Sequence, residues 1–352
     1  MTIVFEGKTF DLLPDETLLE GIERQGSSVP SFCRRGICQA CVLQALRGAV
    51  PAAAQKGLKE GYRRQGFLLA CVCRPAEDLE VERCGLSQRF LSRVEHVEPL
   101  SQEVLRVFLR VPEGFCYDAG QYVQLERLQD GLMRPFSLAS VPGSLALELH
   151  VARLPGGSMS GWLPGAVGQS VGIRGPFGDC SYVAAELDRP LLLAGTGTGL
   201  APLLGVVRAA LAAGHRGPIR LYHGGLSRAG LYLWAELIQL AERALGLEVV
   251  GSVLSEAPPT RQEGDGRCLI VNTALDQLVL GAAVEWGKQR VYLCGHPELV
   301  QTLQRKIYLA GASLDRIHSD PFVAPGSVSP QINAGLAAPP PRGGEGAATP
   351  AR

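Results

Sequence analysis

The chain has 352 residues, enough for two or three domains that each bury their own hydrophobic core. Its 34 basic and 34 acidic side chains balance to zero net charge, so the overall charge gives no reason to expect nucleic acid or an anionic membrane as a partner. We also find no apolar run long enough for a membrane span and no basic-then-apolar leader, and we expect a cytoplasmic protein.

The first elements in chain order predict a small α+β unit. Alternating segments at 2–5 and 8–12 surround Glu6-Gly7 and predict a hairpin. Residues 15–22 predict a short amphipathic helix with acidic residues in its first turn. Further short strands are expected at 41–46, 70–73 and 79–81.

This first unit carries a cysteine pattern typical of a metal cluster. Cys33, Cys38 and Cys41 have the spacing C-x4-C-x2-C, and Cys71 follows at a distance, which is the ligand pattern of a plant-type 2Fe–2S cluster. Gly36 supplies unconstrained backbone where the loop wraps the cluster. Zinc is the alternative, but structural zinc sites usually show two C-x2-C-like pairs and only one is present here.

The same residues resemble a known module. The run C-R-x-G-x-C-x-x-C, followed by L-x-C-x-x-x-P, is similar to plant and bacterial ferredoxins. The resemblance implies a β-grasp fold and a 2Fe–2S cluster bound by Cys33, Cys38, Cys41 and Cys71. Cys73 points the other way on an extended segment and is expected to be a bystander.

From about residue 87 the pattern changes to short alternating strands at 93–97, 104–111 and 121–125, which predict an antiparallel β-barrel. Arg134-Pro135-Phe136-Ser137 is a weak signal alone. A glycine–serine turn at 156–160 then leads into a short helix, whose first amides suit a pyrophosphate.

The order R-x-F-S, G-G-x-x-S and G-P-F-G resembles the flavin domain of the ferredoxin–NADP reductase superfamily. The resemblance implies FAD, with Arg134 on its phosphates, Phe136 stacked on the isoalloxazine and Ser137 near N5. The residues implied at the pyrophosphate are Gly157, Ser158, Met159 and Ser160. Most members have tyrosine at position 136, so phenylalanine keeps the stacking surface and loses one hydroxyl contact. His150 and Arg153 are open between a flavin contact and a surface pair.

The third segment predicts alternating β/α units. An apolar run at 191–194 is typical of a strand covered on both faces, and a glycine-rich turn and an apolar helix through Leu211 follow it. Further strands are expected at 219–223, 248–253 and 290–293. The last of them leads into Cys294-Gly295-His296-Pro297, at the strand end where open α/β sheets bind ligands.

The form G-T-G-T-G-L-A-P resembles the nicotinamide domain of the same superfamily and predicts a Rossmann-like NAD domain. It implies dinucleotide contacts from Gly195, Thr196, Gly197, Thr198, Gly199, Cys294 and Gly295. Ser137 and Cys294 would then lie beside the transferred hydride, although a buried thiol is the alternative for Cys294. Only Arg228 offers a charge for a 2′-phosphate, which is not enough to predict NADPH. Relatives with an N-terminal ferredoxin module usually take NADH, so the resemblance implies NADH, and NADPH stays open.

The expected organisation is a ferredoxin domain at 1–86, an FAD barrel at 87–186, an NAD domain at 187–322 and a disordered tail at 323–352, which is rich in Pro, Gly and Ala. By resemblance, Phe322 covers the flavin.

Together these motifs predict an electron-transfer reductase. A hydride brings two electrons, a 2Fe–2S cluster accepts one, and a flavin can connect them. The resemblance is to single-chain reductases that serve bacterial ring-hydroxylating dioxygenases and di-iron monooxygenases, which implies a protein electron acceptor. The alternatives are a reductase for an iron–sulfur dehydratase in deoxysugar biosynthesis and a non-catalytic redox sensor. Arg34 and Arg35 are candidates for docking an acidic partner.

Overall fold

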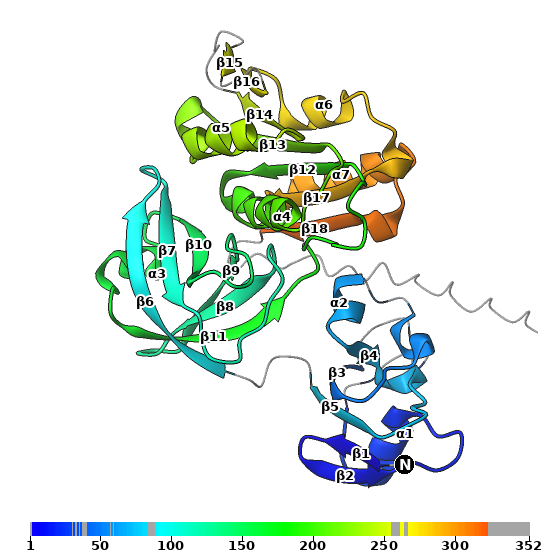
Figure 1. Cartoon of the computed structure of the whole chain (residues 1–352). Helices are drawn as coiled ribbons and strands as arrows, with labels where there is room; N and C mark the ends of the chain where they lie inside the picture. Colours follow the sequence, from blue (N-terminus) through cyan, green and yellow to red (C-terminus); the bar gives the residue numbers. More distant parts are fainter. Residues whose placement is uncertain are drawn as a thin grey trace, which may run out of the picture. The chain divides into compact units, whose positions relative to one another are not determined.

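The computed structural model describes residues 2–29, 31, 34, 36, 41–56, 58, 60–83, 89–254, 261–263 and 267–322. Figure 1 shows three sheets that follow one another along the chain. Met1–Phe322 forms one compact unit by its internal contacts. The expected tail at 323–352 lies outside the described residues. Among the helices that the structure describes, none combines the length and apolar character needed to cross a membrane.

The first sheet has five strands in the order β2-β1-β5-β3-β4, with β1 and β5 parallel and the other pairs antiparallel. Helix α1 packs on it through Leu18, Leu19 and Ile22, which are all buried. The bounds are β1 (Thr2–Phe5), β2 (Lys8–Asp11), α1 (Leu18–Arg24), β3 (Val42–Arg47), η1 (Ala52–Gln55), α2 (Glu60–Arg64), β4 (Phe67–Leu69), η2 (Ala70–Val72) and β5 (Leu79–Arg83).

Two expectations for this part are wrong in detail. The helix begins at Leu18, not at Asp15, because Thr17 and Glu20 form a capping box in which each side chain binds the other's backbone amide. The strand expected at 70–73 is a 3₁₀ turn, η2, because the antiparallel pairing with β3 ends at Leu69. That turn redirects the chain at Cys71.

The second sheet has six antiparallel strands in the order β10-β7-β6-β11-β8-β9. Its two outer strands approach through a bridge between Leu138 and Leu149, so the sheet curls toward the expected barrel. The bounds are β6 (Arg89–Pro99), β7 (Val104–Arg110), β8 (Tyr122–Arg127), β9 (Leu132–Ser137), β10 (Ala146–Ala152), α3 (Ser158–Trp162), η3 (Leu163–Gly165) and β11 (Ser170–Phe177).

The third sheet has the order β15-β16-β14-β13-β12-β17-β18 and is parallel except for β15. Alternate residues of β12 belong to two hydrophobic clusters, one shared with residues of α4 and α5 and the other with residues of α6 and α7, which explains its continuous apolar run. The bounds are β12 (Leu191–Thr196), η4 (Gly197–Gly199), α4 (Leu200–Ala212), β13 (Ile219–Gly225), η5 (Arg228–Gly230), α5 (Trp234–Arg243), β14 (Leu247–Val253), β15 (Arg261–Glu263), β16 (Cys268–Val271), α6 (Leu275–Leu280), η6 (Trp286–Lys288), β17 (Arg290–Gly295), α7 (Pro297–Leu309), η7 (Leu314–Arg316) and β18 (Ile317–Pro321).

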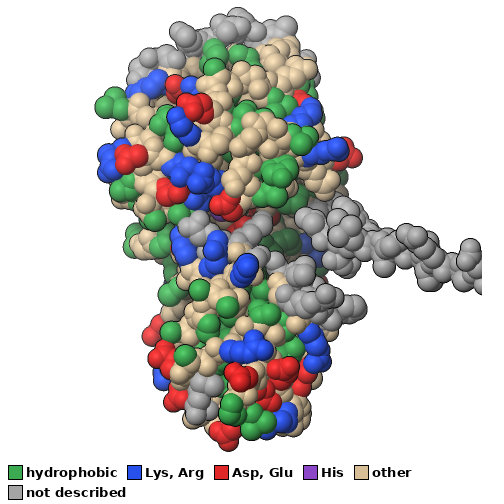
Figure 2. Space-filling model, turned by 90° about the vertical axis from the view of Figure 1, so that its right-hand side faces the viewer, with side chains coloured by type: hydrophobic (Ala, Val, Ile, Leu, Met, Phe, Trp, Pro, Cys, Tyr) green, Lys and Arg blue, Asp and Glu red, His purple; other side chains and the backbone are tan. Residues whose placement is uncertain are grey.

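The surface shows the same charge balance as the sequence. On the face in Figure 2, basic and acidic side chains are interspersed with apolar and neutral ones. Side chains of opposite charge pair in several places, as in Arg24–Glu16 at 2.7 Å and Arg83–Glu6 at 2.7 Å. Exposed pairs of this kind contribute about 0–1 kcal/mol each, so they affect solubility more than stability.

Candidate functional site

Two of the four predicted cluster ligands lie in the described residues, and the fold brings them together. Cys41 and Cys71 are both buried, and the Ala70 amide donates to the Cys41 carbonyl at 3.0 Å. Burial raises the pKa of Cys41 to about 11. Such a thiol ionises readily only beside a cation, so this half of the ligand set fits an iron cluster. Cys33 and Cys38 lie outside the described residues.

The surroundings of these thiols also fit a tight cluster loop. Gly36 has a φ of +73°, and a Cβ there would lie 3.2 Å from Cγ2 of Val72. Cys73 is fully buried in the hydrophobic core of this part. Arg34, predicted to dock a partner, forms an ion pair with Glu23 at 3.0 Å, and Arg35 lies outside the described residues.

The predicted flavin residues lie together on β9, two of them half-buried and the third buried. Ser137 is buried and its hydroxyl donates to the Asp320 carboxylate at 3.2 Å. Phe136 is half-buried against the barrel core. Arg134 is half-exposed, and its guanidinium donates to the Met133 carbonyl at 2.7 Å. An aromatic surface beside an arginine and a hydroxyl is chemically suited to an isoalloxazine and its phosphates.

The predicted pyrophosphate loop forms the start of α3, with Gly157 at the N-cap. Glycine carries no capping side chain, so the first amides of this turn remain available to an anion. Met159 and Ser160 are buried, and the Ser160 hydroxyl accepts a hydrogen bond from the Leu154 amide at 3.3 Å. Met159 and Ser160 can therefore offer a pyrophosphate their backbone amides but not their side chains. Sequence reasoning missed Arg127, which donates to the Ser158 carbonyl at 2.9 Å.

The two predicted nicotinamide motifs lie against each other. A Cβ on Gly199 would lie 2.6 Å from the Cys294 carbonyl oxygen, and one on Gly295 would lie 2.7 Å from the Thr196 carbonyl oxygen. The His296 amide also donates to the Thr196 hydroxyl at 3.1 Å. Space is open above Gly197, where a Cβ would meet no atom within 4 Å. The turn therefore offers backbone and free space to a dinucleotide.

Cys294 itself is fully buried, and its sulfur lies 3.3 Å from the sulfur of Cys180. Burial, followed by the hydrogen bond with Cys180, raises the pKa of Cys294 well above its usual range. The predicted hydride neighbour is thus a neutral thiol in the core of this region. Cys180, which belongs to none of the sequence motifs, lies beside it.

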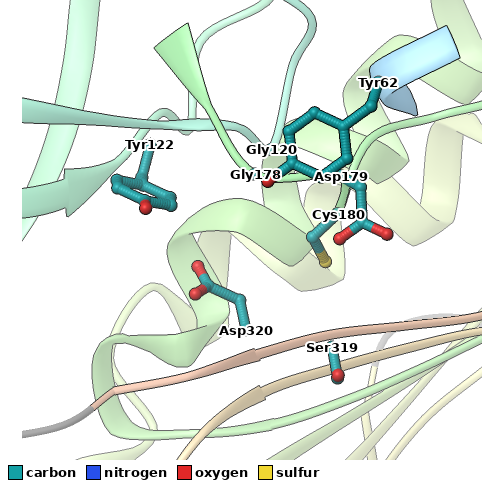
Figure 3. Close-up of a pocket in the computed structure, with 8 residues that line it drawn as sticks. All are labelled: Tyr62, Gly120, Tyr122, Gly178, Asp179, Cys180, Ser319 and Asp320. Carbon is teal, nitrogen blue, oxygen red and sulfur yellow. The ribbon is translucent and has the colours of Figure 1, made fainter. Parts of the chain in front are cut away.

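A pocket of about 270 Å³ lies next to these residues, and Figure 3 shows its lining. Ser319 and Asp320 come from β18, and Tyr122 comes from β8. Burial and then the charge of Asp320 raise the pKa of Tyr122. The full lining is Tyr62, Gly120, Tyr122, Gly178, Asp179, Cys180, Ser319 and Asp320. Of these, Asp320 could have been found from its place two residues before Phe322, whose amide donates to the Gly295 carbonyl at 2.8 Å.

Tyr62 belongs to α2 of the first part, and the neighbouring Arg64 also reaches the other parts. Its guanidinium donates to the Ser181 hydroxyl at 3.2 Å and to the Tyr182 carbonyl at 3.3 Å. It lies 3.7 Å from the Asp118 carboxylate. The pocket is therefore lined by residues from all three parts: Tyr62 from the first, Tyr122 from the second and Asp320 from the third.

A buried polar network joins the second and third parts. Glu148 on β10 accepts hydrogen bonds from Arg106 at 2.8 Å and from Arg208 of α4 at 2.6 Å. His150 contacts Glu148 at 3.0 Å and the Tyr232 hydroxyl at 3.1 Å. His150 is therefore buried and not a surface residue, and it connects β10 to the third part. Its contact with the flavin stays a prediction.

Comparisons with known proteins agree with this layout. Residues 3–76 match the 2Fe–2S iron–sulfur cluster binding domain, residues 92–182 the oxidoreductase FAD-binding domain and residues 193–305 the oxidoreductase NAD-binding domain. The chain is 34% identical to the reductase subunit of an aromatic O-demethylase from Amycolatopsis sp., across 90% of this chain and 96% of that protein. It is 29% identical to the ferredoxin–NAD(P)⁺ reductase component of the naphthalene 1,2-dioxygenase system of Pseudomonas putida, across 88% and 94%.

Solved structures give the same result. The crystal structure of an Amycolatopsis cytochrome P450 reductase has a TM-score of 0.61 and 31% identity, covering 92% of this chain and 99% of that one. A ferredoxin reductase of carbazole 1,9a-dioxygenase has a TM-score of 0.58 and 25% identity, covering 92% and 98%. The likeness therefore extends over all three parts of the described chain.

Proposed function

Because this chain belongs to the family of single-chain reductases that join a 2Fe–2S domain to FAD- and NAD-binding domains, we propose that it takes electrons from NADH and delivers them singly to an oxygenase component. It is a NAD(P)H-dependent oxidoreductase of the ferredoxin reductase type, with a 2Fe–2S cluster, FAD and NAD(P)H as its cofactors. We propose two points beyond this: that the electron donor is NADH, and that the electron acceptor is an oxygenase component.

One observation carries the proposal: residues matched to the cluster-binding and FAD-binding domains, and residues of the NAD-domain sheet, line the same pocket. Tyr62 lies in the first match, Tyr122 and Cys180 lie in the second, and Asp320 lies on β18 of the third sheet. A reductase that passes electrons between unlike cofactors needs such a meeting point, because bound FAD supplies both two-electron and one-electron chemistry.

The proposed site follows from the geometry of the chain's own side chains. Arg134, Phe136 and the α3 amides would hold FAD, and the turn at Gly195–Gly199 would hold the dinucleotide. Ser137 and Asp320 share a hydrogen bond at the pocket edge, where they can hold or pass a proton. Cys294 and Gly295 would support the nicotinamide end, and Phe322 would cover the flavin. Cys33, Cys38, Cys41 and Cys71 would bind the cluster.

The domain boundaries at 86, 186 and 322 and a cytoplasmic location belong to the same proposal. The three family matches support the domain boundaries, since each match falls inside one expected domain. The cytoplasmic location is supported by the donor, because NADH is a cytoplasmic metabolite.

The acceptor is proposed from the relatives. Those compared above serve an aromatic O-demethylase and a naphthalene dioxygenase, and a further relative, 27% identical, is the reductase component of a propane 2-monooxygenase from Gordonia sp.. A dehydratase of deoxysugar biosynthesis is the competing acceptor. Hydroxylated product formed with an oxygenase component encoded beside this chain, in step with NADH consumption, would support the oxygenase.

The test separates the two ends of the electron path. Purified holoprotein should oxidise NADH faster than NADPH with either ferricyanide or cytochrome c as acceptor. Cys71→Ser should lose cytochrome c reduction, which needs the cluster, and keep ferricyanide reduction. Cys116→Ser, at an exposed cysteine, is the matched control and should keep both. Bound cofactors with negligible NADH oxidation would instead indicate a redox sensor.

A further inference from the structure

Cys180 and Cys294 form a close pair of thiols, and the proposed function gives their sulfur atoms no redox role. Their sulfurs are 3.3 Å apart, and the residues are 2% and 0% exposed. A disulfide bond is about 2.0 Å long, so the sulfurs would need to approach by about 1.3 Å. A rotation of the two side chains is a change of this size.

The pair connects two parts of the chain that are far apart in sequence. Cys180 lies in the match to the FAD-binding domain, after β11, and Cys294 lies in the match to the NAD-binding domain, in β17. The Tyr292 hydroxyl donates to the Ser181 carbonyl at 3.2 Å, which holds the two segments together beside the sulfurs. A bond between the sulfurs would therefore tie the two domains covalently.

The two thiols differ in access. Cys180 lines the pocket with Tyr122 and Asp320, as Figure 3 shows, whereas Cys294 is not among the lining residues. A small reagent in the pocket would therefore meet Cys180 first. Burial keeps Cys294 protonated by raising its pKa, so it is poorly suited to react first and is placed to react second.

We propose that Cys180 and Cys294 are an oxidative modification site at which a hydroperoxide forms a disulfide between the FAD- and NAD-binding domains. The Cys180 sulfur attacks one peroxide oxygen, the O–O bond breaks, and a sulfenic acid and an alcohol (water, for hydrogen peroxide) result. The Cys294 sulfur then attacks the sulfenic sulfur, the S–S bond forms, the S–O bond breaks, and water leaves with the Cys294 proton. The two thiols lose two electrons and two protons in total, and the hydroperoxide takes them up.

The expected consequence, which rests on the proposed function, is loss of NADH oxidation. Cys294 precedes Gly295, which packs on the Thr196 carbonyl of the dinucleotide turn. Fixing this strand end to Cys180 would prevent the adjustment that binding a nicotinamide beside it requires. A thiol reductant should reverse the loss.

The experiment treats full-length holoprotein with hydrogen peroxide, blocks the remaining thiols and maps linked peptides by mass spectrometry. Wild type and Cys116→Ser should both give a peptide linking Cys180 to Cys294, and Cys180→Ser should not. NADH–ferricyanide activity should fall in the first two proteins and recover with dithiothreitol. Cys180→Ser, compared with its own untreated sample, should show no dithiothreitol-reversible loss.

Oxidised Cys180 without a link to Cys294, or no reaction at either cysteine, would overturn the site. A link that leaves NADH oxidation unchanged would overturn the inactivation. The peptide map is read without turnover, so it also distinguishes this proposal from the proposed function: untreated protein that does not oxidise NADH would refute the latter only.

Discussion

Glu148 shows how a single buried carboxylate can stay charged between two parts of a protein. Burial alone would raise its pKa, but the hydrogen bond with His150 and the charges of Arg208 and Arg106 lower it to about 2, from an ordinary value of 4.5. The surrounding groups come from β7, β10 and α4, and Arg106 also pairs with Glu236 of α5 at 2.9 Å and with Glu98 of β6 at 3.6 Å. Removing the carboxylate would take from Arg106 and Arg208 the negative charge that they share.

We predict that Glu148→Gln lowers the free energy of unfolding at pH 7 by about 3 kcal/mol. The folded pKa lies below the unfolded one, so the contribution of Glu148 is complete above pH 4.5 and is lost as the pH falls toward 2. The difference between wild type and variant should therefore shrink over that range. Urea denaturation at several pH values measures it, with the exposed Glu242→Gln as control. A difference that does not change with pH would contradict this assignment.

At the scale of elements, the strand end at Cys294-Gly295 and the turn at Gly195–Gly199 depend on glycine for their contact. Gly199 has the closest approach, because a Cβ there would meet the Cys294 carbonyl oxygen at 2.6 Å and its carbonyl carbon at 2.7 Å. Both are backbone atoms of a strand held between two neighbours, so they cannot move aside cheaply.

We predict that Gly199→Ala displaces the turn and raises the KM for NADH by roughly tenfold, equivalent to a strain of about 1–3 kcal/mol. Ferricyanide reduction at varied NADH concentration measures the change. Gly230→Ala is the control, because a Cβ there makes only an ordinary contact at 3.5 Å. An unchanged KM in a folded Gly199→Ala protein would show that the turn does not bind the dinucleotide.

The elements also show what could be predicted from the sequence. Elements with a local sequence pattern were predicted correctly. The hairpin around Glu6-Gly7 and the apolar strand β12 are two examples. The strand expected at 70–73 failed because Cys71 has to turn toward Cys41, a constraint set by a residue thirty positions away in the chain. The contact between Cys180 and Cys294 likewise depends on packing between two domains, which no local pattern contains.

At the scale of the whole molecule, the function needs three parts that are each stable and that meet. Every sheet has its own hydrophobic core, and the described residues form one compact unit. Among the described residues, Arg64 makes three polar contacts from the first part to the second. Such contacts resemble those of transient interfaces and permit motion between parts.

We therefore predict that Arg64→Glu, which places a carboxylate near Asp118, slows NADH-driven cytochrome c reduction by about fivefold. Ferricyanide reduction, which does not need the first part, should stay unchanged. Arg63→Glu is the matched control, because it makes the same charge change one residue away on α2, at a side chain that makes none of the three Arg64 contacts. Equal cytochrome c rates in both variants would show that the Arg64 contacts do not matter for transfer. A parallel loss of ferricyanide reduction would show instead that the variant damages the flavin or nicotinamide site, since that acceptor bypasses the cluster.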